Sequence, residues 1–471
     1  MGVMGGTKAM NVSKEVDLGK EKIGKLFFML ALPAITSQVV NALYNMVDRM
    51  YIGHIPKVGA AALTGVGICF PVIMIVSAFA ALAGMGGAPR ASIMMGSGNN
   101  KDAEKILGNC CCALAVTAMI LTPSVLFFQR PLLMLFGASE NTLPYAMSYI
   151  AIYAAGTLFV QLTLGMNAFI AAQGFSRVSM MTVVIGAVCN IILDPIFIFL
   201  FDMGVRGAPR ATVISQGVSA LWVLSFLMGK RTVLRLKLSN FRISLSVLLP
   251  AIALGVAPFI MQATESVLVL CFYSSLLRYG GDLAVGAMTI LAGVMQFAML
   301  PQIGFTQGAQ PIVSYNYGAN NPERVKKTFN LLLLCCMIYS FVLWALIMAF
   351  PLLFTSIFTN DPALTKISVW ALRIYMATSL LLGAQFACQQ TFIALGNAKT
   401  STFLALFRKV IVLIPLIYIL PLFFKDKVMA VFLAEPIADT LAVITTVTLF
   451  AVEFRNLLKT MREKNAAARR G

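Results

Sequence analysis

Histidine is almost absent from this sequence, since its 471 residues contain only His54. A histidine proton relay and a metal site built from several histidines are therefore excluded. Acidic residues are also few, with 18 Asp and Glu against 36 Lys and Arg, and charged residues make up 11% of the chain. Soluble domains carry about 25% charged residues. With 59% hydrophobic residues, the chain is predicted to be an all-α polytopic membrane protein.

Several motifs of soluble enzymes and of nucleic-acid binding are missing as well. The nine cysteines form no CxxC pair, and we interpret them as small packing residues without a bound metal. The GxxxxGK[ST] phosphate loop is absent, so ATP is not expected to be the direct energy source, and no cofactor is predicted. The net charge of +18 is attributed to loops at a membrane surface, so nucleic acid is not an expected partner. Met1–Lys25 has no signal-peptide pattern.

Twelve apolar segments are long enough to cross a bilayer. Their predicted limits are 26–52, 60–83, 105–128, 145–170, 177–200, 208–228, 247–276, 284–308, 328–352, 367–394, 402–424 and 428–453. Lysine and arginine gather in both tails and after the second, sixth and eighth segments. Because these residues favour cytoplasmic loops, we expect a multi-pass protein of the cell membrane with both termini in the cytoplasm.

The two halves of the chain repeat each other. Pro258 corresponds to Pro33 and Pro311 corresponds to Pro89, and the separation within the two pairs is nearly the same. Both halves begin on the same side, so the repeats are parallel and define two pseudo-symmetric six-helix lobes, the usual architecture of alternating-access transporters. The predicted division is a tail (1–25), an N-lobe (26–228), a loop (229–246), a C-lobe (247–453) and a basic tail (454–471).

The first apolar segment carries polar residues on one helical face. They are Gln38, Asn41, Asn45 and Asp48, at steps of three, four and three residues, with Tyr44 on the flank of that face. Pro33 lies near the start of the segment and is predicted to bend it. A carboxylate facing lipid costs at least ~2.5 kcal/mol, so Asp48 should face protein or a wet cavity. The alternative is that Asp48 pairs with the neighbouring Arg49.

A second acid lies at a similar depth on the fifth segment. Asp194 is four residues after Asn190 and precedes Pro195, while Thr212 lies near the start of the sixth segment. Two carboxylates, an amide and a hydroxyl at one level predict a site for a hard cation such as Na⁺. The alternatives are a proton shared between the two carboxyls, and a structural helix end at Asp194 and Pro195.

These motifs, in this order, resemble those of the MATE (multidrug and toxic compound extrusion) family, and within it the MepA-like bacterial branch. The matching stretches are Leu32-Pro33, Tyr44–Asp48, Asn190–Phe197, Gly207–Gln216 and Glu435–Asp439. The resemblance implies a two-lobed antiporter that exports organic cations in exchange for Na⁺ or H⁺. It also implies that Asp48, Asn190, Asp194 and Thr212 bind that cation, and that the bend at Pro33 is associated with binding.

Isolated acids also occur in the second half. Glu265 is read either as a C-lobe cation ligand or as a structural acid bonded to Gln262. Glu435 and Asp439 are expected to be structural, pairing with Arg408 or Lys409. The polar and flexible residues expected to line a drug cavity are Gln38, Asn41, Tyr44, Asn45, Met261, Gln262, Glu265, Met288 and Gln296.

Two other functions compete with drug export. A lipid-linked sugar flippase has a strongly cationic cavity, but the sequence places few basic residues inside spans, with Arg177, Arg408 and Lys409 near their ends. An intramembrane aspartyl protease requires a GxGD motif, which is absent. We therefore expect a non-enzymatic, monomeric exporter of small cationic drugs embedded in a lipid bilayer.

Overall fold

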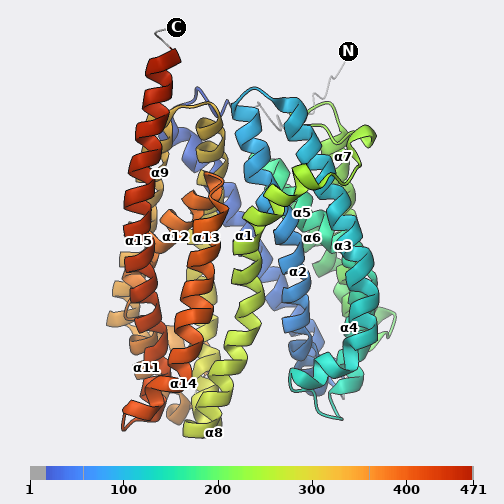
Figure 1. The fold of residues 1–471 in the computed structure, drawn as a ribbon. Coiled ribbons are helices and arrows are strands. Elements are labelled where there is room, and N and C mark those ends of the chain that lie inside the picture. Colours follow the sequence, from blue (N-terminus) through green and yellow to red (C-terminus); the bar gives the residue numbers. More distant parts are fainter. Residues whose placement is uncertain (1–16, 57, 360, 469–471) are drawn as a thin grey trace, which may run out of the picture.

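A computed structural model of the chain describes residues 17–56, 58–359 and 361–468. These residues form helices joined by short turns, with no β-strand among them (Figure 1). The predicted tails 1–25 and 454–471 lie partly outside the described residues. Leu18 and Asn465 both contact the segment around Asn316–Asn320, so the two ends of the described chain lie at the same end of the molecule. We call this the terminal end.

The first lobe consists of α1 to α7. Its helices are α1 (Ile23–Gly53), α2 (Gly59–Gly96), α3 (Asn100–Leu135), α4 (Leu143–Ala155), α5 (Thr157–Ala172), α6 (Ser176–Pro195) and α7 (Gly207–Met228). A π-helical turn, Ile196–Leu200, continues α6, and a 3₁₀ turn, Gly204–Arg206, leads into α7. Helix α1 runs through Pro33 without a break in its helical assignment. The predicted bend at this proline stays a prediction.

The second lobe consists of α8 to α15. Its helices are α8 (Leu245–Gly318), α9 (Pro322–Ala349), α10 (Pro351–Thr355), α11 (Pro362–Tyr375), α12 (Ser379–Ala394), α13 (Ala398–Leu406), α14 (Ile414–Phe423) and α15 (Lys427–Ala468). A π-helical segment, Phe407–Leu413, joins α13 to α14. The linker between the lobes contains one 3₁₀ turn, Leu238–Asn240, and its Lys237 pairs with Glu104 of α3 at 2.6 Å.

Among the described residues, nine helices are long and apolar enough to span a bilayer, and two bent pairs, α4 with α5 and α11 with α12, bring the spans to eleven. Helix α8 is itself two helices joined at Gly281, whose φ of 63° suits glycine. Counting its two parts separately gives twelve crossings. The predicted all-α, polytopic, two-lobed fold is confirmed.

The repeat is visible in the turn that follows the second span of each lobe. Gly98 and Asn320 occupy equivalent positions in the two repeats, and both have positive φ. The next residue in each case, Asn99 or Asn321, caps the following helix by accepting a hydrogen bond from a backbone N–H. Asparagine tolerates the left-handed conformation better than most residues, so one turn geometry is built with either Gly-Asn or Asn-Asn.

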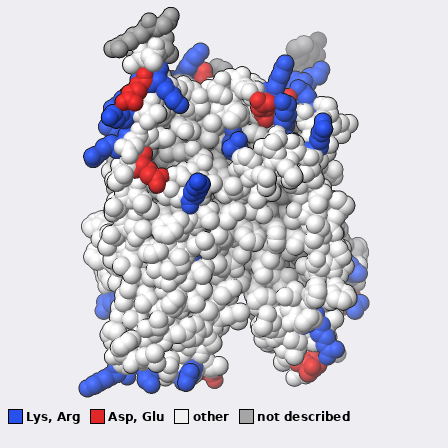
Figure 2. Space-filling model, viewed as in Figure 1, with Lys and Arg blue, Asp and Glu red and all other residues white. Residues whose placement is uncertain are grey.

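The surface has the charge distribution of a membrane protein. Figure 2 shows lysine and arginine concentrated at the terminal end, fewer charges at the opposite end, and a broad uncharged band between them. Large apolar side chains are exposed on the outside of the helices, including Phe127 and Phe423, which are each 80% exposed. Such exposure in a helical bundle is stable in lipid.

The two lobes touch in the half of the molecule nearer the termini and separate toward the opposite end, where Figure 2 shows a hollow between them. Most of their contacts are formed by α1 and α2 against α8. Glycines allow the backbones to meet: a Cβ on Gly86 would lie 2.1 Å from Ala251 O, and one on Gly255 would lie 1.8 Å from Leu82 O. We call these contacts the glycine seam.

Candidate functional site

Asp48 of α1 and Asp194 of α6 meet inside the N-lobe. Their carboxyl groups face each other within hydrogen-bonding reach, and the residues are only 8% and 0% exposed. Asn190 donates from Nδ2 to Asp194 Oδ1 at 3.3 Å and also lies 3.4 Å from Thr212 Oγ1. The structure therefore brings together all four residues of the predicted cation site, from three helices.

Three oxygens in this group have no hydrogen-bond partner, although they are buried. They are Asp48 Oδ1, Asn190 Oδ1 and Asp194 Oδ2. No lysine or arginine of the described residues forms an ion pair with either carboxyl, and the guanidinium of Arg49 lies over the ring of Phe70 at 5.2 Å. Buried oxygens without donors are costly unless a cation or a proton meets them. The arrangement fits a small hard cation or a shared proton.

Backbone irregularity next to Asp194 helps to place this group. The helix changes from α to π geometry directly after Pro195, which supplies no N–H to its ladder. On the facing helix, Gly207 allows α7 to approach that turn, because a Cβ there would lie 2.7 Å from Phe197 C. Thr212 donates to Ala208 O at 3.1 Å, so its hydroxyl oxygen stays directed toward Asn190.

A cavity adjoins the acid pair inside the N-lobe. Besides Asn190 and Thr212, its walls include the predicted cavity residues Asn41 and Tyr44. Hydroxyl and amide side chains of α5, α6 and α7 complete much of the lining, namely Thr163, Thr182, Ser215, Gln216 and Ser219. Asn45 is exposed and donates to Asn41 O at 2.7 Å, so it is held on the same helix.

Two of the predicted cavity residues connect the lobes. Gln38 Nε2 donates to Gln307 Oε1 at 3.2 Å, from α1 to α8. Gln262 Nε2 lies 3.9 Å from the sulfur of Met85, from α8 to α2. In the sequence, the separation between Gln38 and Gln262 is nearly the same as that between Met85 and Gln307. The internal repeat therefore relates one contact to the other. Both contacts join α8 to a helix of the N-lobe, as the glycine seam does.

The remaining predicted cavity residues are divided between surface and core. Gln296 is exposed, and Met261 is half-buried beside Gln389, whose Nε2 lies 3.4 Å from the Met261 sulfur. Met288 is 3% exposed and belongs to the apolar core of the C-lobe, so the structure does not place it on a cavity wall. Its neighbours on α8 alternate between core and surface, and the sequence alone did not reveal which face Met288 occupies.

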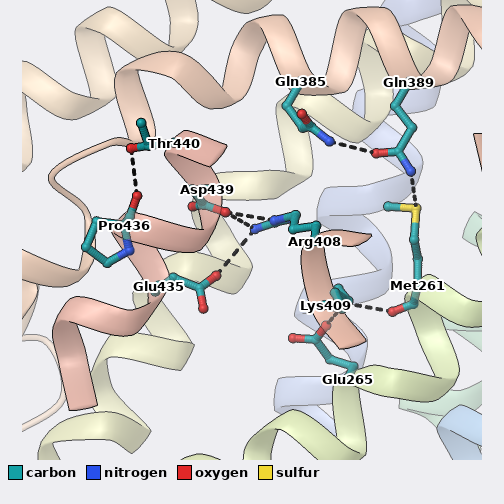
Figure 3. A network of polar contacts seen from close by, with 10 residues as sticks. All are labelled: Met261, Glu265, Gln385, Gln389, Arg408, Lys409, Glu435, Pro436, Asp439 and Thr440. Atoms are coloured by element: carbon teal, nitrogen blue, oxygen red, sulfur yellow. Dashed lines mark hydrogen bonds and ion pairs between the residues drawn. The ribbon is translucent and has the colours of Figure 1, made fainter. Parts of the chain in front are cut away.

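Figure 3 shows a network of charged side chains inside the C-lobe. Arg408 donates from Nε to Asp439 Oδ1 at 2.7 Å and from Nη2 to Glu435 Oε1 at 3.3 Å. The two acids lie four residues apart on α15, so one guanidinium reaches both. Of the two candidate partners, Arg408 and Lys409, the structure pairs both acids with Arg408. Their structural role stays a prediction.

Lys409 pairs with Glu265, and its ammonium group also donates to Met261 O at 2.8 Å. The suggested bond between Glu265 and Gln262 is wrong, because Gln262 reaches across to Met85. The expected place of Arg408 and Lys409 near a span end is also wrong: the helix starts at Ala398, and their side chains are 14% and 10% exposed. Two adjacent cations in an apolar segment were the sequence signal for this network.

Replacing Arg408 by methionine is expected to destabilise the protein by about 3 kcal/mol, because it leaves two buried acids without their counter-ion. Thermal unfolding of the detergent-purified protein measures this change. The control is Arg130→Met, since the Arg130 and Glu140 side chains are exposed and 4.0 Å apart. Asp439→Asn added to the Arg408 variant should restore part of the loss. Equal melting temperatures for the two arginine variants would contradict the prediction.

Comparisons with known proteins match both lobes of the chain. The MatE family model matches residues 33–196 and 258–419, one segment in each lobe. The chain is 23% identical to the multidrug export protein MepA of Staphylococcus haemolyticus over 425 residues, which is 90% of this chain and 93% of that protein. A similar MepA of Staphylococcus aureus strain NCTC 8325 is 24% identical, covering 85% of this chain and 88% of that protein.

Solved structures of MATE transporters have the same fold. A crystal structure of MATE in the bent conformation superposes with a TM-score of 0.89 at 23% identity, covering 96% of this chain and all of that chain. The outward-facing conformation of a multidrug resistance MATE family transporter of the MOP superfamily gives 0.86 at 23% identity, covering 95% and 99%. The family model matches more than half of the chain, once in each lobe, and so the chain belongs to the MatE family.

Proposed function

We propose that this protein exports small organic cations across the cell membrane in exchange for Na⁺ or H⁺ bound at Asp48, Asn190, Asp194 and Thr212. Membership of the MatE family and the naming of its relatives as multidrug export proteins support the export of drugs. The protein works as a monomer, and no step requires covalent chemistry.

The observation that carries the choice of ion site is a contrast between the lobes. The C-lobe acids Glu265, Glu435 and Asp439 each have a lysine or arginine partner. Asp48 and Asp194 contact each other and have no such partner among the described residues. A buried acid pair without an internal counter-ion needs a cation or a proton from outside the protein. This need supports the N-lobe pair as the acceptor of the coupling ion.

The shape of the molecule supports one half of an alternating-access cycle. The hollow between the lobes opens at the end opposite the termini, and the lobes are in contact at the glycine seam (Figures 1 and 2). With the termini in the cytoplasm, as the distribution of lysine and arginine indicates, this state faces outward. Ion binding at α1 and α6 then drives the cycle only through a difference in affinity between the outward and inward states.

Transport into everted vesicles with the two ion gradients imposed separately tests this proposal. Vesicles that contain the protein should take up a fluorescent cation such as ethidium when a Na⁺ or a proton gradient is applied, and uptake should stop when that gradient is dissipated. ATP in the absence of a gradient should drive nothing. Uptake that depends on ATP alone, or translocation of a lipid-linked sugar without movement of the dye, would overturn the proposal.

A further inference from the structure

The ion pair between Lys409 and Glu265 is unequally buried. The Lys409 side chain is 10% exposed, whereas that of Glu265 is 59% exposed. Lys409 contacts Glu265 through the single oxygen Oε2, and none of the hydrogen bonds in this network uses Oε1 (Figure 3). The ammonium group is therefore more deeply buried than the carboxylate, most of which stays exposed.

The neighbours of Glu265 indicate that its exposed side faces the opposite lobe, toward the hollow and away from lipid. Glu265 lies on α8 one turn after Met261, whose sulfur meets Gln389 of α12, and three residues after Gln262, which contacts Met85 of the opposite lobe. These contacts are those expected on a side of α8 that faces the space between the lobes. A carboxylate exposed to lipid would cost at least ~2.5 kcal/mol, whereas a carboxylate in a water-filled hollow keeps its hydration.

Lys409 has a second acceptor that would hold it without Glu265. Its ammonium donates to the carbonyl oxygen of Met261 at 2.8 Å, one helical turn before Glu265 on the same face. Lys409 also lies in the π-helical segment Phe407–Leu413, an irregularity often found at functional sites. The neighbouring acids Glu435 and Asp439 share Arg408, so Lys409 has Glu265 as its own acidic partner.

We propose that Glu265 is a recognition group for the cationic nitrogen or phosphorus of a transported drug, and that Lys409 is a tethered cation competing with the drug for this carboxylate. The inference rests on the proposed function and deepens it. Lys409 neutralises Glu265 when no drug is bound, so the C-lobe does not collect the coupling ion. Lys409 also lowers affinity for every cation that binds there, which allows the drug to leave.

Equilibrium binding in detergent, at fixed pH and Na⁺ concentration, tests this pair without requiring transport. The probes are tetraphenylphosphonium, a monovalent cation, and triphenylphosphine oxide, a neutral molecule of similar form. Lys409→Met should tighten binding of the cation about tenfold and leave the neutral probe unchanged. Lys409→Arg, which keeps the charge, should bind the cation as the wild type does. Glu265→Gln should weaken binding of the cation about tenfold, again without affecting the neutral probe.

The matched control is Lys427→Met, which removes an exposed lysine that lies over the ring of Tyr279. It should bind both probes as the wild type does. If Lys409→Met does not fold, Glu265→Gln decides alone. Equal changes for the two probes, or unaltered cation binding by Glu265→Gln, would overturn the inference. Vesicle transport tests the proposed function separately. A protein that fails to transport the dye can still be tested for the difference in binding between the cationic and the neutral probe.

Discussion

Replacing Asp194 by asparagine is expected to reduce ion-driven efflux of a fluorescent cation to the level of vesicles without the protein. Asparagine keeps the size of the side chain and can still accept the hydrogen bond from Asn190 Nδ2. It cannot bind a proton in the pH range of the assay or supply a negative oxygen to Na⁺. Because Asp48 and Asp194 face each other, Asp48→Asn should have the same effect. The loss should appear in the response to a gradient, with drug binding in detergent retained.

The control for this experiment is Asp202→Asn. Asp202 belongs to the same lobe, is exposed and has a φ of 51°, a conformation that asparagine tolerates well. This variant should therefore couple efflux to the gradient as the wild type does. Both acid variants should also reach the membrane in wild-type amounts, since removing charge from a buried pair of like charges relieves repulsion. Gradient-driven efflux at the wild-type rate in both variants would contradict the site.

The ion site was largely predictable from the sequence because its residues follow helical spacing. Asn190 and Asp194 are four residues apart, and an acid in an apolar segment must face protein or water. These two rules do not require any knowledge of how the helices pack. Depth along each span then placed Thr212 at the same level, and the structure brings that residue to Asn190.

The pairing of the C-lobe charges was only partly predictable. An i, i+4 pair of acids and two adjacent cations suggested contact between α15 and the membrane span before it, but not which cation each acid would take. Adjacent helical residues point about 100° apart, so Arg408 and Lys409 must turn to different partners. That choice depends on the rotation of three packed helices, which a single sequence does not reveal.

The glycine seam was missed for a related reason. Glycine is common in membrane helices, and its sequence position does not tell where two backbones meet. The internal repeat contained a signal for this contact. Gly96 corresponds to Gly318 and Ile93 corresponds to Tyr315, because the two pairs have the same separation in the sequence. In the structure a Cβ on Gly96 would lie 1.9 Å from Tyr315 O, and a Cβ on Gly318 would lie 1.9 Å from Ile93 O. The same contact therefore occurs twice, related by the pseudo-symmetry of the lobes.

Introducing alanine at both Gly96 and Gly318 is expected to shift the transporter out of the observed state and to stop transport. Each methyl group would overlap a backbone carbonyl on the facing helix, and backbone cannot move aside as the end of a side chain can. Overpacking costs about 1–3 kcal/mol at a site, so the two substitutions together cost up to about 6 kcal/mol. Reversing a 99:1 preference between two states takes about 5.5 kcal/mol.

Spin labels at Ser139→Cys and Ser356→Cys, in a background where the native cysteines are alanine, measure this shift. Both positions are exposed in loops at the end where the hollow opens, one on each lobe. Opening of the seam should bring those loops together, so the distance between the labels should shorten in the double alanine variant.

The control is Gly67→Ala, because Gly67 lies on α2 like Gly96 and a Cβ there meets nothing within 4 Å. This variant should keep the wild-type distance and the wild-type rate of transport. Unchanged distances in the double variant, together with normal transport, would mean that the lobes do not need this contact. A shortened distance would instead show that backbone packing at the seam holds the far end open, because neither substitution touches the ion site or the hollow.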